Sequence, residues 1–553
     1  MNLNISRRKK MKKVLIAAAW PYVNGSLHLG HVAALLPADV IARYHRARGD
    51  DVLFVSGSDC HGTPILVTAD REGLSPGEVA TRYHNEFVDT LVGKLKFSYS
   101  LYSKTMGDFH KGVAQNVFAT LHSEGHMVSH EEEQAYCNTC QRFLPDRFIE
   151  GTCPRCASAS ARGDQCDSCG KPYTPKELEN PRCKTCGATP SWRPSTHLYL
   201  CLPKFQNRLE EWSVAQRGWR ENAVTTTKSW LKQGLKERPV TRDLSWGIPV
   251  PVIGFEEKCI YVWFEAVCGY LSCSKEWATL HGSPEAWREW WENPDSLHYY
   301  VHGKDNIPFH TIIWPAILMG LGLHLPDRII SSEFLNFEGV KFSKSQGIGV
   351  WLPQVLEKFE PDAIRFYLVA SGPETNDTNF QWQDFQQRVN AELIGVLANF
   401  WNRTFSMTHR YFGSVPDVEV VSQESLELMR ECEAIFRAVG QHIQDAELRL
   451  ALNGLLNLAR HANVYLEHRK PWEQFGTDRV HVAETLAVCC IVSDTLRRIS
   501  QPFIPNTTER LNRFLGVTDV VWSYSPLPAG HTIGEPSPLV QKVDLDAITN
   551  GTK

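Results

Sequence analysis

Four cysteine pairs of the form Cys-x-x-Cys lie within fifty consecutive residues and constrain this chain more than any other feature. The gaps between them are 12, 9 and 13 residues, and the pairs are Cys137 and Cys140, Cys153 and Cys156, Cys166 and Cys169, and Cys183 and Cys186. Four thiolates close one tetrahedral zinc shell, so eight close two shells with none left over. The spacing therefore predicts two zinc sites in one compact module and leaves open which pairs share an ion.

The composition is that of a globular protein with several domains. A length of 553 residues is too great for one core and suggests about three or four domains. The net charge of −4 excludes a protein whose whole surface binds nucleic acid, so any such contact is expected in a local patch. Eight of the 16 cysteines are scattered outside the pairs, which favours a reducing cytoplasm over disulfides.

The N-terminus imitates a signal peptide, because the basic residues 7–10 precede the apolar residues 14–19. The apolar run is short and is followed by the turn signals of residues 20–25, so we interpret it as a buried first strand. No stretch approaches the roughly 20 apolar residues of a membrane span.

Strand-like apolar runs alternate with helical periodicity on both sides of the cysteine module. Strands are expected at residues 14–19, 52–55, 261–264, 299–302 and 328–332, and helices at 27–48, 75–96 and 109–124. This order predicts an α/β class with a Rossmann-type parallel sheet that the zinc insert divides. Beyond Pro361 the chain becomes helical, and apolar residues at 448, 452, 455, 459, 462 and 466 predict the buried face of a bundle helix.

These patterns divide the chain into six segments. We expect a first Rossmann half at residues 12–125, a connective insert with zinc knuckles at 126–239 and a second Rossmann half at 240–330. A connecting fold at 331–386 leads to an all-α bundle at 387–530, and residues 531–553 form a tail. The rising Pro and Gly content from about residue 527 predicts a loosely ordered end.

Two short motifs indicate a nucleotide site. His28-Leu29-Gly30-His31 opens the first expected helix, where free N–H groups and the helix dipole attract phosphate. Residues 339–347 form a glycine-flanked loop whose Lys341 and Lys344 could clamp a pyrophosphate as charge moves onto it. Each alone could be a chance match or an exposed basic turn, but together they favour a nucleotide-binding enzyme.

The two motifs resemble the signature motifs of class I aminoacyl-tRNA synthetases. Further segments resemble the methionyl-tRNA synthetase family in particular, in the order Trp20-Pro21-Tyr22-Val23-Asn24-Gly25, Asp59-Cys60-His61-Gly62-Thr63-Pro64, Leu144-Pro145-Asp146-Arg147, Tyr261-Val262-Trp263 and Gly303-Lys304-Asp305. The resemblance runs from about residue 12 to residue 472. It implies a methionine–tRNA ligase that makes methionyl adenylate from methionine and ATP and transfers it to the 3′ end of tRNA(Met).

The resemblance also implies roles for single residues. His28 and His31 act on the reacting phosphate together with Lys341 and Lys344, and Gly30 leaves room for the nucleotide base. Asp59 is implied to hold the amino group of methionine. Aromatic groups suit a polarizable thioether, and the implied side-chain site consists of Trp20, Tyr22, Trp263, Tyr270, Phe309, His310 and Trp314.

Three positions depart from the family's usual pattern. Trp20 replaces a smaller side chain such as Leu beside the methionine site, and Val267 replaces a common Pro. Both leave the shape of the pocket open. Phe342 replaces Met in the lysine loop, an apolar exchange that should be tolerated.

The helical region carries the residues implied to bind the anticodon. Asn399 and Arg403, four residues apart on one helix, and Trp472 would receive the unstacked bases. Nearby basic residues between Arg460 and Lys470 would supply the local positive patch. The alternative for Trp472 is a core tryptophan at a helix start after proline.

Cofactors and partners follow from the same resemblance. ATP is expected with Mg²⁺, and both zinc ions are expected to be structural, because all-thiolate shells leave no open coordination position. Relatives with one zinc keep the inner four cysteines, which favours nested pairing: Cys153, Cys156, Cys166 and Cys169 on one ion, and Cys137, Cys140, Cys183 and Cys186 on the other. Sequential pairing is the alternative. The partners are tRNA(Met), ATP and L-methionine, and we expect a cytoplasmic monomer that contacts no membrane.

Three other functions compete with this interpretation. A ligase for another apolar amino acid would carry a larger hydrolytic editing domain than an insert of ~110 residues allows. A cysteine-specific ligase would place metal ligands in the pocket, where Cys60 and His61 are one candidate pair. A non-catalytic RNA-binding relative would have no use for Asp59, the two histidines or the two lysines.

Overall fold

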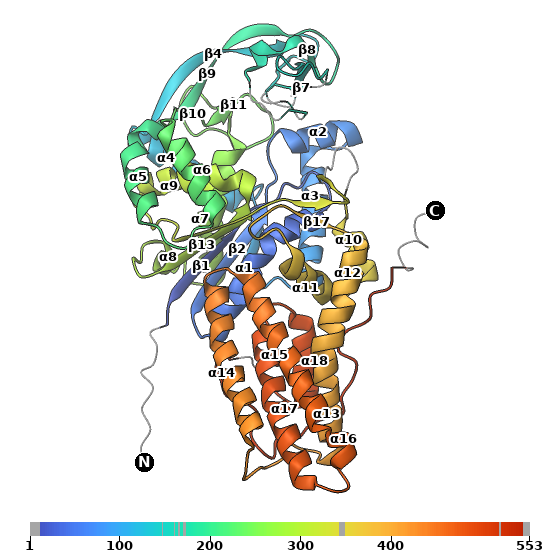
Figure 1. The fold of residues 1–553 in the computed structure, drawn as a ribbon. Helices are drawn as coiled ribbons and strands as arrows, with labels where there is room; N and C mark the ends of the chain where they lie inside the picture. The colour runs from blue at the N-terminus through green and yellow to red at the C-terminus, as the bar shows by residue number, and fades with distance from the viewer. Residues whose placement is uncertain are drawn as a thin grey trace.

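A computed structural model describes residues 11–145, 148–159, 161–163, 166, 168–169, 173–341, 349–518 and 521–545. Figure 1 shows a β-rich insert at the top, a parallel sheet with its helices in the middle and a helical bundle at the bottom. None of the helices within these ranges combines the length and the apolarity that a membrane-spanning helix needs.

Within the described residues the central sheet has five parallel strands, in the order β14-β13-β1-β2-β3. Alternate residues of β1 enter two different cores: Val14 and Ile16 pack on one face of the sheet, and Leu15 and Ala17 on the other. Burial on both faces explains the continuous apolar runs and confirms the expected Rossmann-type sheet. The strands are β1 (Lys13–Ala18), β2 (Asp51–Ser58), β3 (Leu101–Lys104), β13 (Leu297–Gly303) and β14 (Arg328–Ser332).

Helices cover both faces of this sheet (Figure 1). The helix predicted at residues 27–48 is α1, and the one at 109–124 is α4, so both predictions are confirmed. The pattern at 75–96 is a helix continued by a π-helical segment. The elements are α1 (Leu29–Ala47), α2 (Thr63–Glu72), α3 (Pro76–Phe87), η1 (Val88–Lys94), α4 (Asp108–Ser123), α7 (Val262–Leu280), α8 (Arg288–Trp291) and α9 (Trp314–Leu321).

The strand predicted at residues 261–264 is wrong. Only β12 (Cys259–Ile260) is extended there, paired with β11 (Thr241–Arg242), and α7 begins at Val262. A short apolar aromatic run fits a strand or a buried helix equally well. The second predicted strand is also longer than expected, because β2 continues through Ser58 and pairs with β3 there.

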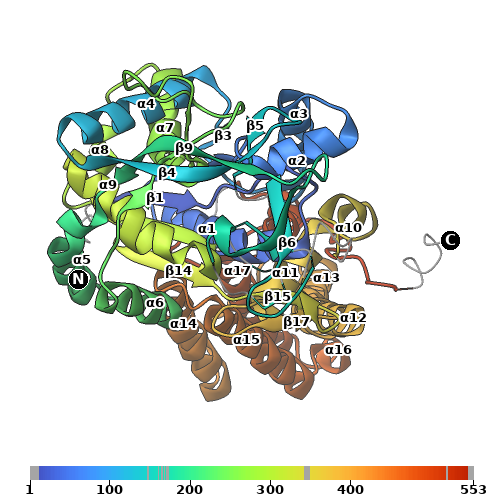
Figure 2. The same cartoon turned by 90° about the horizontal axis from the view of Figure 1, so that it is seen from above.

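The insert is built on a long antiparallel pair, β4 (Met127–Cys137) and β9 (Ser191–Leu200). Seen from above in Figure 2, this pair lies across the central sheet. The insert also contains β5 (Arg142–Phe143), β6 (Ile149–Thr152), β7 (Ala161–Arg162), β8 (Glu179–Cys183), β10 (Arg238–Pro239), α5 (Gln206–Ala215) and α6 (Glu221–Lys232).

The bundle follows a small connecting fold. The apolar stripe from Leu448 to Leu466 is buried along one face of α15, as predicted. The connecting elements are β15 (Leu335–Phe337), β16 (Val340–Lys341), α10 (Leu352–Lys358), α11 (Pro361–Ser371), β17 (Thr378–Phe380), α12 (Trp382–Arg388) and η8 (Val389–Ala398). The bundle helices are α13 (Asn399–Tyr411), α14 (Gln423–Gln444), α15 (Leu448–Arg469), α16 (Pro471–Gln474), α17 (Arg479–Ser500) and α18 (Pro505–Leu515).

The expectation of a loose C-terminal end is wrong for residues 527–545. Leu527, Ile533, Leu539 and Val543 are buried in the larger core. The backbone of Val543 also hydrogen-bonds to the side chain of Asn390. Proline and glycine set the irregular path of this segment, but its spaced apolar side chains hold it against the bundle.

Candidate functional site

The His28–His31 motif forms the first turn of α1, the first helix after β1. The backbone N–H of His28 donates to His31 Nδ1 at 3.1 Å, so His31 caps the helix, and the two ring centroids are 3.7 Å apart. When neutral, the His31 ring therefore carries its proton on Nε2. The Leu29 N–H donates to Val350 O at 3.1 Å, which ties this turn to the segment before α10. The turn presents two imidazoles and a helix N-terminus together.

A cavity of about 280 Å³ opens beside this turn. It lies at the carboxyl ends of the strands, where open α/β sheets bind their ligands. Four predicted site residues line it, namely Trp20, His28, Gly30 and His31, together with residues of the β13 end such as Gly303 and Asn306. The location and the lining support a nucleotide site.

Asp59 follows β2 at the same edge of the sheet and is buried. Its backbone is fixed against the turn after β1, because its N–H donates to Pro21 O at 3.0 Å and its carbonyl accepts from Val23 at 3.1 Å. Burial, together with the charge of Glu265, raises the pKa of the Asp59 carboxyl well above its usual range. Among the described residues no lysine or arginine pairs with it, so a ligand cation would find an uncompensated carboxylate here.

The predicted aromatic residues fall into two contacting groups. In the first, the rings of Trp263 and Phe309 stack with centroids 4.1 Å apart and planes 13° apart. Tyr22 meets Trp263 edge-on at 6.1 Å, and its backbone pairs with Asp59. This group therefore connects the carboxylate to a flat aromatic surface.

The second group centres on His310. Its Nδ1 is 2.9 Å from the carbonyl of Asn306, so Nδ1 carries the proton, and Nε2 accepts from the Tyr270 hydroxyl at 2.8 Å. Burial lowers the pKa of His310 to about 4, which keeps the ring neutral. Trp314 lies edge-on to Tyr270 at 6.3 Å and donates to the Tyr300 hydroxyl. Both groups are therefore built from α7 and the segment after β13, and Tyr22 joins the first group from the turn after β1.

Trp20 occupies a slot between two glycines. A Cβ on Gly57 of β2 would lie 2.3 Å from its ring, and one on Gly269 of α7 would lie 2.7 Å from it. The large side chain is thus accommodated by two positions that have none, and it still lines the cavity. The other unusual residue, Val267, is buried in the core beneath α7.

Sequence reasoning missed a polar cluster behind Asp59. The Nδ1 of His61 bonds to the buried carboxylate of Glu265, and His110 on α4 approaches the same carboxylate. Cys60, the other half of the candidate metal pair, donates its thiol to Ser58 O and joins no group of three metal-binding side chains in the part described. An acidic residue two positions after Trp263 was the available signal, but nothing local shows that it faces two histidines.

The structure describes only part of the lysine loop. The backbone of Lys341 lies in β16, which pairs with β15 next to the cavity. The side chain of Lys341 and the whole of Lys344 and Phe342 lie outside the described residues, as do Asp146 and Arg147. The structure therefore locates the entry to this loop beside the cavity and no more.

The eight paired cysteines form two groups of four. One contains Cys153, Cys156, Cys166 and Cys169, the other Cys137, Cys140, Cys183 and Cys186, and within each group the sulfur atoms lie within 4.8 Å of one another. Sulfurs on one tetrahedral zinc are about 3.8 Å apart, and close pairs here are 3.4–3.9 Å apart. The donor set fits zinc, and the nested grouping is the one that the fold produces.

Two of the three predicted anticodon residues, Arg403 and Trp472, meet at the far end of the bundle. The guanidinium of Arg403 on α13 lies 5.0 Å from the ring centroid of Trp472 on α16 and pairs with Glu467 at 2.7 Å. Trp472 is 37% exposed, so it is not a core residue, and Asn399 is exposed as well. A stacking surface of this kind suits an unpaired base.

The basic patch expected near this surface is largely neutralised. His461 and His468 lie 2.5 and 2.8 Å from glutamates of α14, and Arg469 pairs with Glu484. Lys470 pairs with the nearby Glu473 at 3.1 Å. Attraction of nucleic acid by these residues would therefore require the pairs to open.

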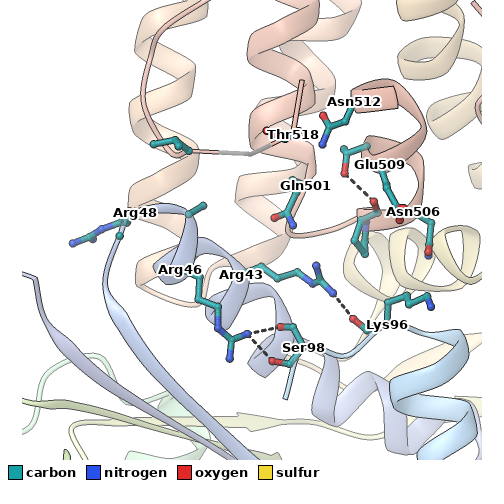
Figure 3. A pocket seen from close by; sticks show the side chains of 15 residues that line it. Arg43, Arg46, Arg48, Lys96, Ser98, Gln501, Asn506, Glu509, Asn512 and Thr518 are labelled. Atoms are coloured by element: carbon teal, nitrogen blue, oxygen red, sulfur yellow. Dashed lines mark hydrogen bonds between the residues drawn. The ribbon is translucent and has the colours of Figure 1, made fainter. Parts of the chain in front are cut away.

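Figure 3 shows a larger cavity of about 690 Å³, between the C-terminal end of α1 and helices α17 and α18. Two of its arginines, Arg43 and Arg48, are paired with Asp39 and Asp50. It lies at the amino end of β2, opposite the edge that carries the motifs, and none of the predicted site residues that the structure describes lines it. The smaller cavity is therefore the candidate active site.

Two family descriptions match the chain. Residues 14–405 match the family described as tRNA synthetases class I (M), and residues 415–550 match the anticodon binding domain of methionyl tRNA ligase. Similar proteins include the methionine–tRNA ligases of Roseiflexus castenholzii, 44% identical with 96% of each chain covered, and of Bacillus mycoides, 43% identical with 97% of each covered.

Solved structures show the same fold. The Mycobacterium tuberculosis methionyl-tRNA synthetase in complex with methionyl-adenylate superposes with a TM-score of 0.80 at 24% identity, covering 96% of this chain and 100% of that one. The ligand-free form of that synthetase matches with a TM-score of 0.73 at 22% identity. At these identities the match concerns the fold alone.

Proposed function

Because the chain belongs to the methionyl-tRNA synthetase family of class I tRNA synthetases, we propose that its sheet-edge cavity joins methionine to the adenylate of ATP. The enzyme is a methionine–tRNA ligase, which then passes the methionyl group to tRNA. The observation that carries the proposed site is the convergence of an uncompensated buried carboxylate, an aromatic group and two imidazoles at a helix start.

In the first step the methionine carboxylate attacks the α-phosphate of ATP, and pyrophosphate leaves. Asp59 holds the ammonium group, which orients the carboxylate toward the nucleotide. The aromatic group beside Asp59 receives the thioether. Neutral Tyr270 and His310 are hydrogen-bonded to each other, so the side-chain site offers no competing charge.

His28 and His31 stabilise the charge that develops on the phosphate, together with the positive end of α1. Lys341 and Lys344 are proposed to act on the departing pyrophosphate. The support for this is the position of β16, whose partner strand β15 begins with the cavity residue Leu335. ATP is proposed to enter with Mg²⁺.

In the second step the 3′-terminal ribose of the tRNA attacks the methionyl adenylate and releases AMP. Trp472, Arg403 and Asn399 are proposed to bind the anticodon of tRNA(Met) at the far end of the bundle. Two zinc ions in the cysteine groups are proposed to hold the knuckles of the insert in shape, because four thiolates satisfy each ion completely. We propose a cytoplasmic monomer with the domain boundaries given above.

The test is ATP–pyrophosphate exchange by the purified full chain with each standard amino acid in turn. Exchange should require methionine, and the same preparation should charge tRNA that carries a CAU anticodon. Exchange with another apolar amino acid, or with cysteine, would assign the enzyme to that ligase class. The absence of exchange with every amino acid, in a folded zinc-containing preparation, would favour the non-catalytic RNA-binding alternative.

A further inference from the structure

A second buried carboxylate, Glu265 on α7, lies behind Asp59. Its side chain is 0% exposed, and that of Asp59 is 3% exposed. His61 touches both: its backbone N–H lies 3.4 Å from Asp59 Oδ1, while its ring Nδ1 bonds to Glu265. His110 approaches the same oxygen of Glu265 with its Nε2 at 3.7 Å.

The two carboxylates differ in how far neighbouring side chains stabilise their negative charge. Burial raises the pKa of Glu265, but His61 and His110 outweigh this effect and bring the pKa to about 2. Glu265 is therefore charged, and Asp59 stands beside it without a lysine or arginine partner among the described residues. Because water screens buried groups little, the charge of Glu265 opposes ionisation of Asp59 in the empty site and strengthens the attraction for a cation placed beside it.

A packing role alone does not account for this cluster. Glu265 Oε2 and His110 Nε2 are buried and have no hydrogen-bond partner among the described residues. Buried polar atoms without partners cost stability, so apolar side chains of similar size would pack better. The cluster is also held rigidly, because His110 Nδ1 bonds to Ser272 Oγ at 2.7 Å and its ring lies 6.0 Å from that of Trp20.

We propose that Glu265 is a positioning residue for methionine activation: through His61 it orients the Asp59 carboxylate, and its charge strengthens the binding of the substrate ammonium. The inference rests on the proposed function of Asp59 and deepens it. It assigns the recognition of the ammonium group to two carboxylates, of which only Asp59 would touch the substrate.

The test compares variants of the full chain in ATP–pyrophosphate exchange. Glu265→Gln keeps the shape of the side chain and a hydrogen bond to His61 but removes the charge, so KM for methionine should rise about tenfold while kcat and KM for ATP change less than about twofold. Glu265→Asp keeps a carboxylate at this position and should therefore retain most of the affinity for methionine. The control is Glu276→Gln on the same helix, where the carboxylate bonds to Ser103, and it should match the wild type.

Two inhibitors make the readout independent of the fraction of folded enzyme. L-Methioninol carries the ammonium group without a carboxylate, and 4-(methylthio)butanoate carries the carboxylate without an ammonium group. Glu265→Gln should weaken inhibition by methioninol about tenfold and leave inhibition by the butanoate unchanged.

Equal weakening of both inhibitors, or a lowered kcat with unchanged KM for methionine, would assign Glu265 a structural role and overturn the proposal. Unchanged constants in Glu265→Gln would overturn it as well. In both cases methionine-dependent exchange by the wild type would leave the proposed function standing. If the wild type shows no such exchange, the function itself fails.

Discussion

At the scale of single residues, the same side chain often serves the fold and the site. His31 accepts the backbone N–H of His28 and so caps α1, yet it also lines the cavity. Trp20 fills the space above Gly57 and Gly269 and forms a wall of the same cavity. Substitutions at these positions must therefore be designed to separate the two contributions.

For His31, the structural and catalytic contributions can be separated with a side chain that caps the helix but has no imidazole. His31→Gln should keep α1 capped, because a glutamine at this helix position can accept the same backbone N–H. Its exchange kcat should still fall by ~10²–10³-fold, with little change in KM for methionine, because stabilisation of the phosphate is lost. His31→Ala should lose the same activity and in addition about 1 kcal/mol of stability in urea unfolding. Near-normal exchange in both variants would exclude the assigned role.

The slot of Trp20 makes a prediction about Gly269. Gly269→Ala places a methyl group 2.7 Å from the Trp20 ring, so it should destabilise the protein by about 1–3 kcal/mol in denaturant unfolding. Adding Trp20→Leu should recover part of this loss. Gly112→Ala on α4 is the control, because a Cβ there meets nothing within 4 Å. Additive effects of the two substitutions would show that the slot is not the cause.

At the scale of elements, the insert and the bundle each present a surface that one helix or strand could not form. Trp472 comes from the short helix α16 and Arg403 from α13, and they meet only because the bundle packs these helices together. The outer cysteine group likewise takes two members from the end of β4 and two from the end of β8, and it closes around the segment after β6 that carries the inner group. Both features can be tested without disturbing the sheet-edge cavity.

Trp472→Ala should impair charging of a CAU-anticodon tRNA and leave ATP–pyrophosphate exchange intact. The expected loss in kcat/KM for tRNA corresponds to about 1–3 kcal/mol, the value of one base–aromatic stack. Val420→Ala, an exposed apolar residue of the same part of the chain, should change neither activity. If exchange and charging fell together, Trp472 would instead be a structural residue of the core.

The nested cysteine groups predict how the metal is lost. The wild type should contain about two zinc ions per chain. Cys153→Ser with Cys166→Ser touches only the inner group, so metal analysis should find about one zinc remaining and limited proteolysis should cut the insert. Cys432→Ser, a buried cysteine of α14, should retain both ions. Loss of both ions in the double variant would contradict independent shells.

At the scale of the whole molecule, one residue joins the insert, the sheet and the bundle. Arg220 stands at the start of α6, and its backbone N–H donates to Ile329 O of β14 at 3.1 Å. Its guanidinium donates to Glu374 O at 2.9 Å and to Ala446 O, just before α15, at 3.3 Å. A planar group with five donors can hold several carbonyls in fixed positions at once.

Arg220→Met should therefore weaken the connection between these parts. The carbonyls that it leaves without donors should cost about 2–3 kcal/mol of stability, visible as a lower Tm and a broader unfolding transition. Arg217→Met is the matched control, because Arg217 is exposed and, within the described part of the chain, donates to carbonyls of its own segment alone. Equal Tm values for the two variants would exclude the proposed role of Arg220.

Local regularities in the sequence were sufficient to predict many of the secondary-structure elements and the metal ligands of this protein. The alternating sides of β1 follow from an unbroken apolar run, the buried face of α15 from a repeat of three and four residues, and the metal ligands from four repeated pairs. Each of these signals depends on neighbours along the chain, which the sequence states directly. The predicted strand at 261–264 failed because a short aromatic run carries no such period.

Contacts between distant segments were decided only by the tertiary structure. Glu265 lies 204 positions from His61 in the chain, yet the packing of α7 against the sheet makes them hydrogen-bonded partners. The same packing brings Gly57 and Gly269 against the ring of Trp20, and the contact of α6 with β14 brings Arg220 to the bundle. The sequence by itself determined which chemical groups this protein has, and folding decided which of them share a buried, low-dielectric space, where their charges act on one another most strongly.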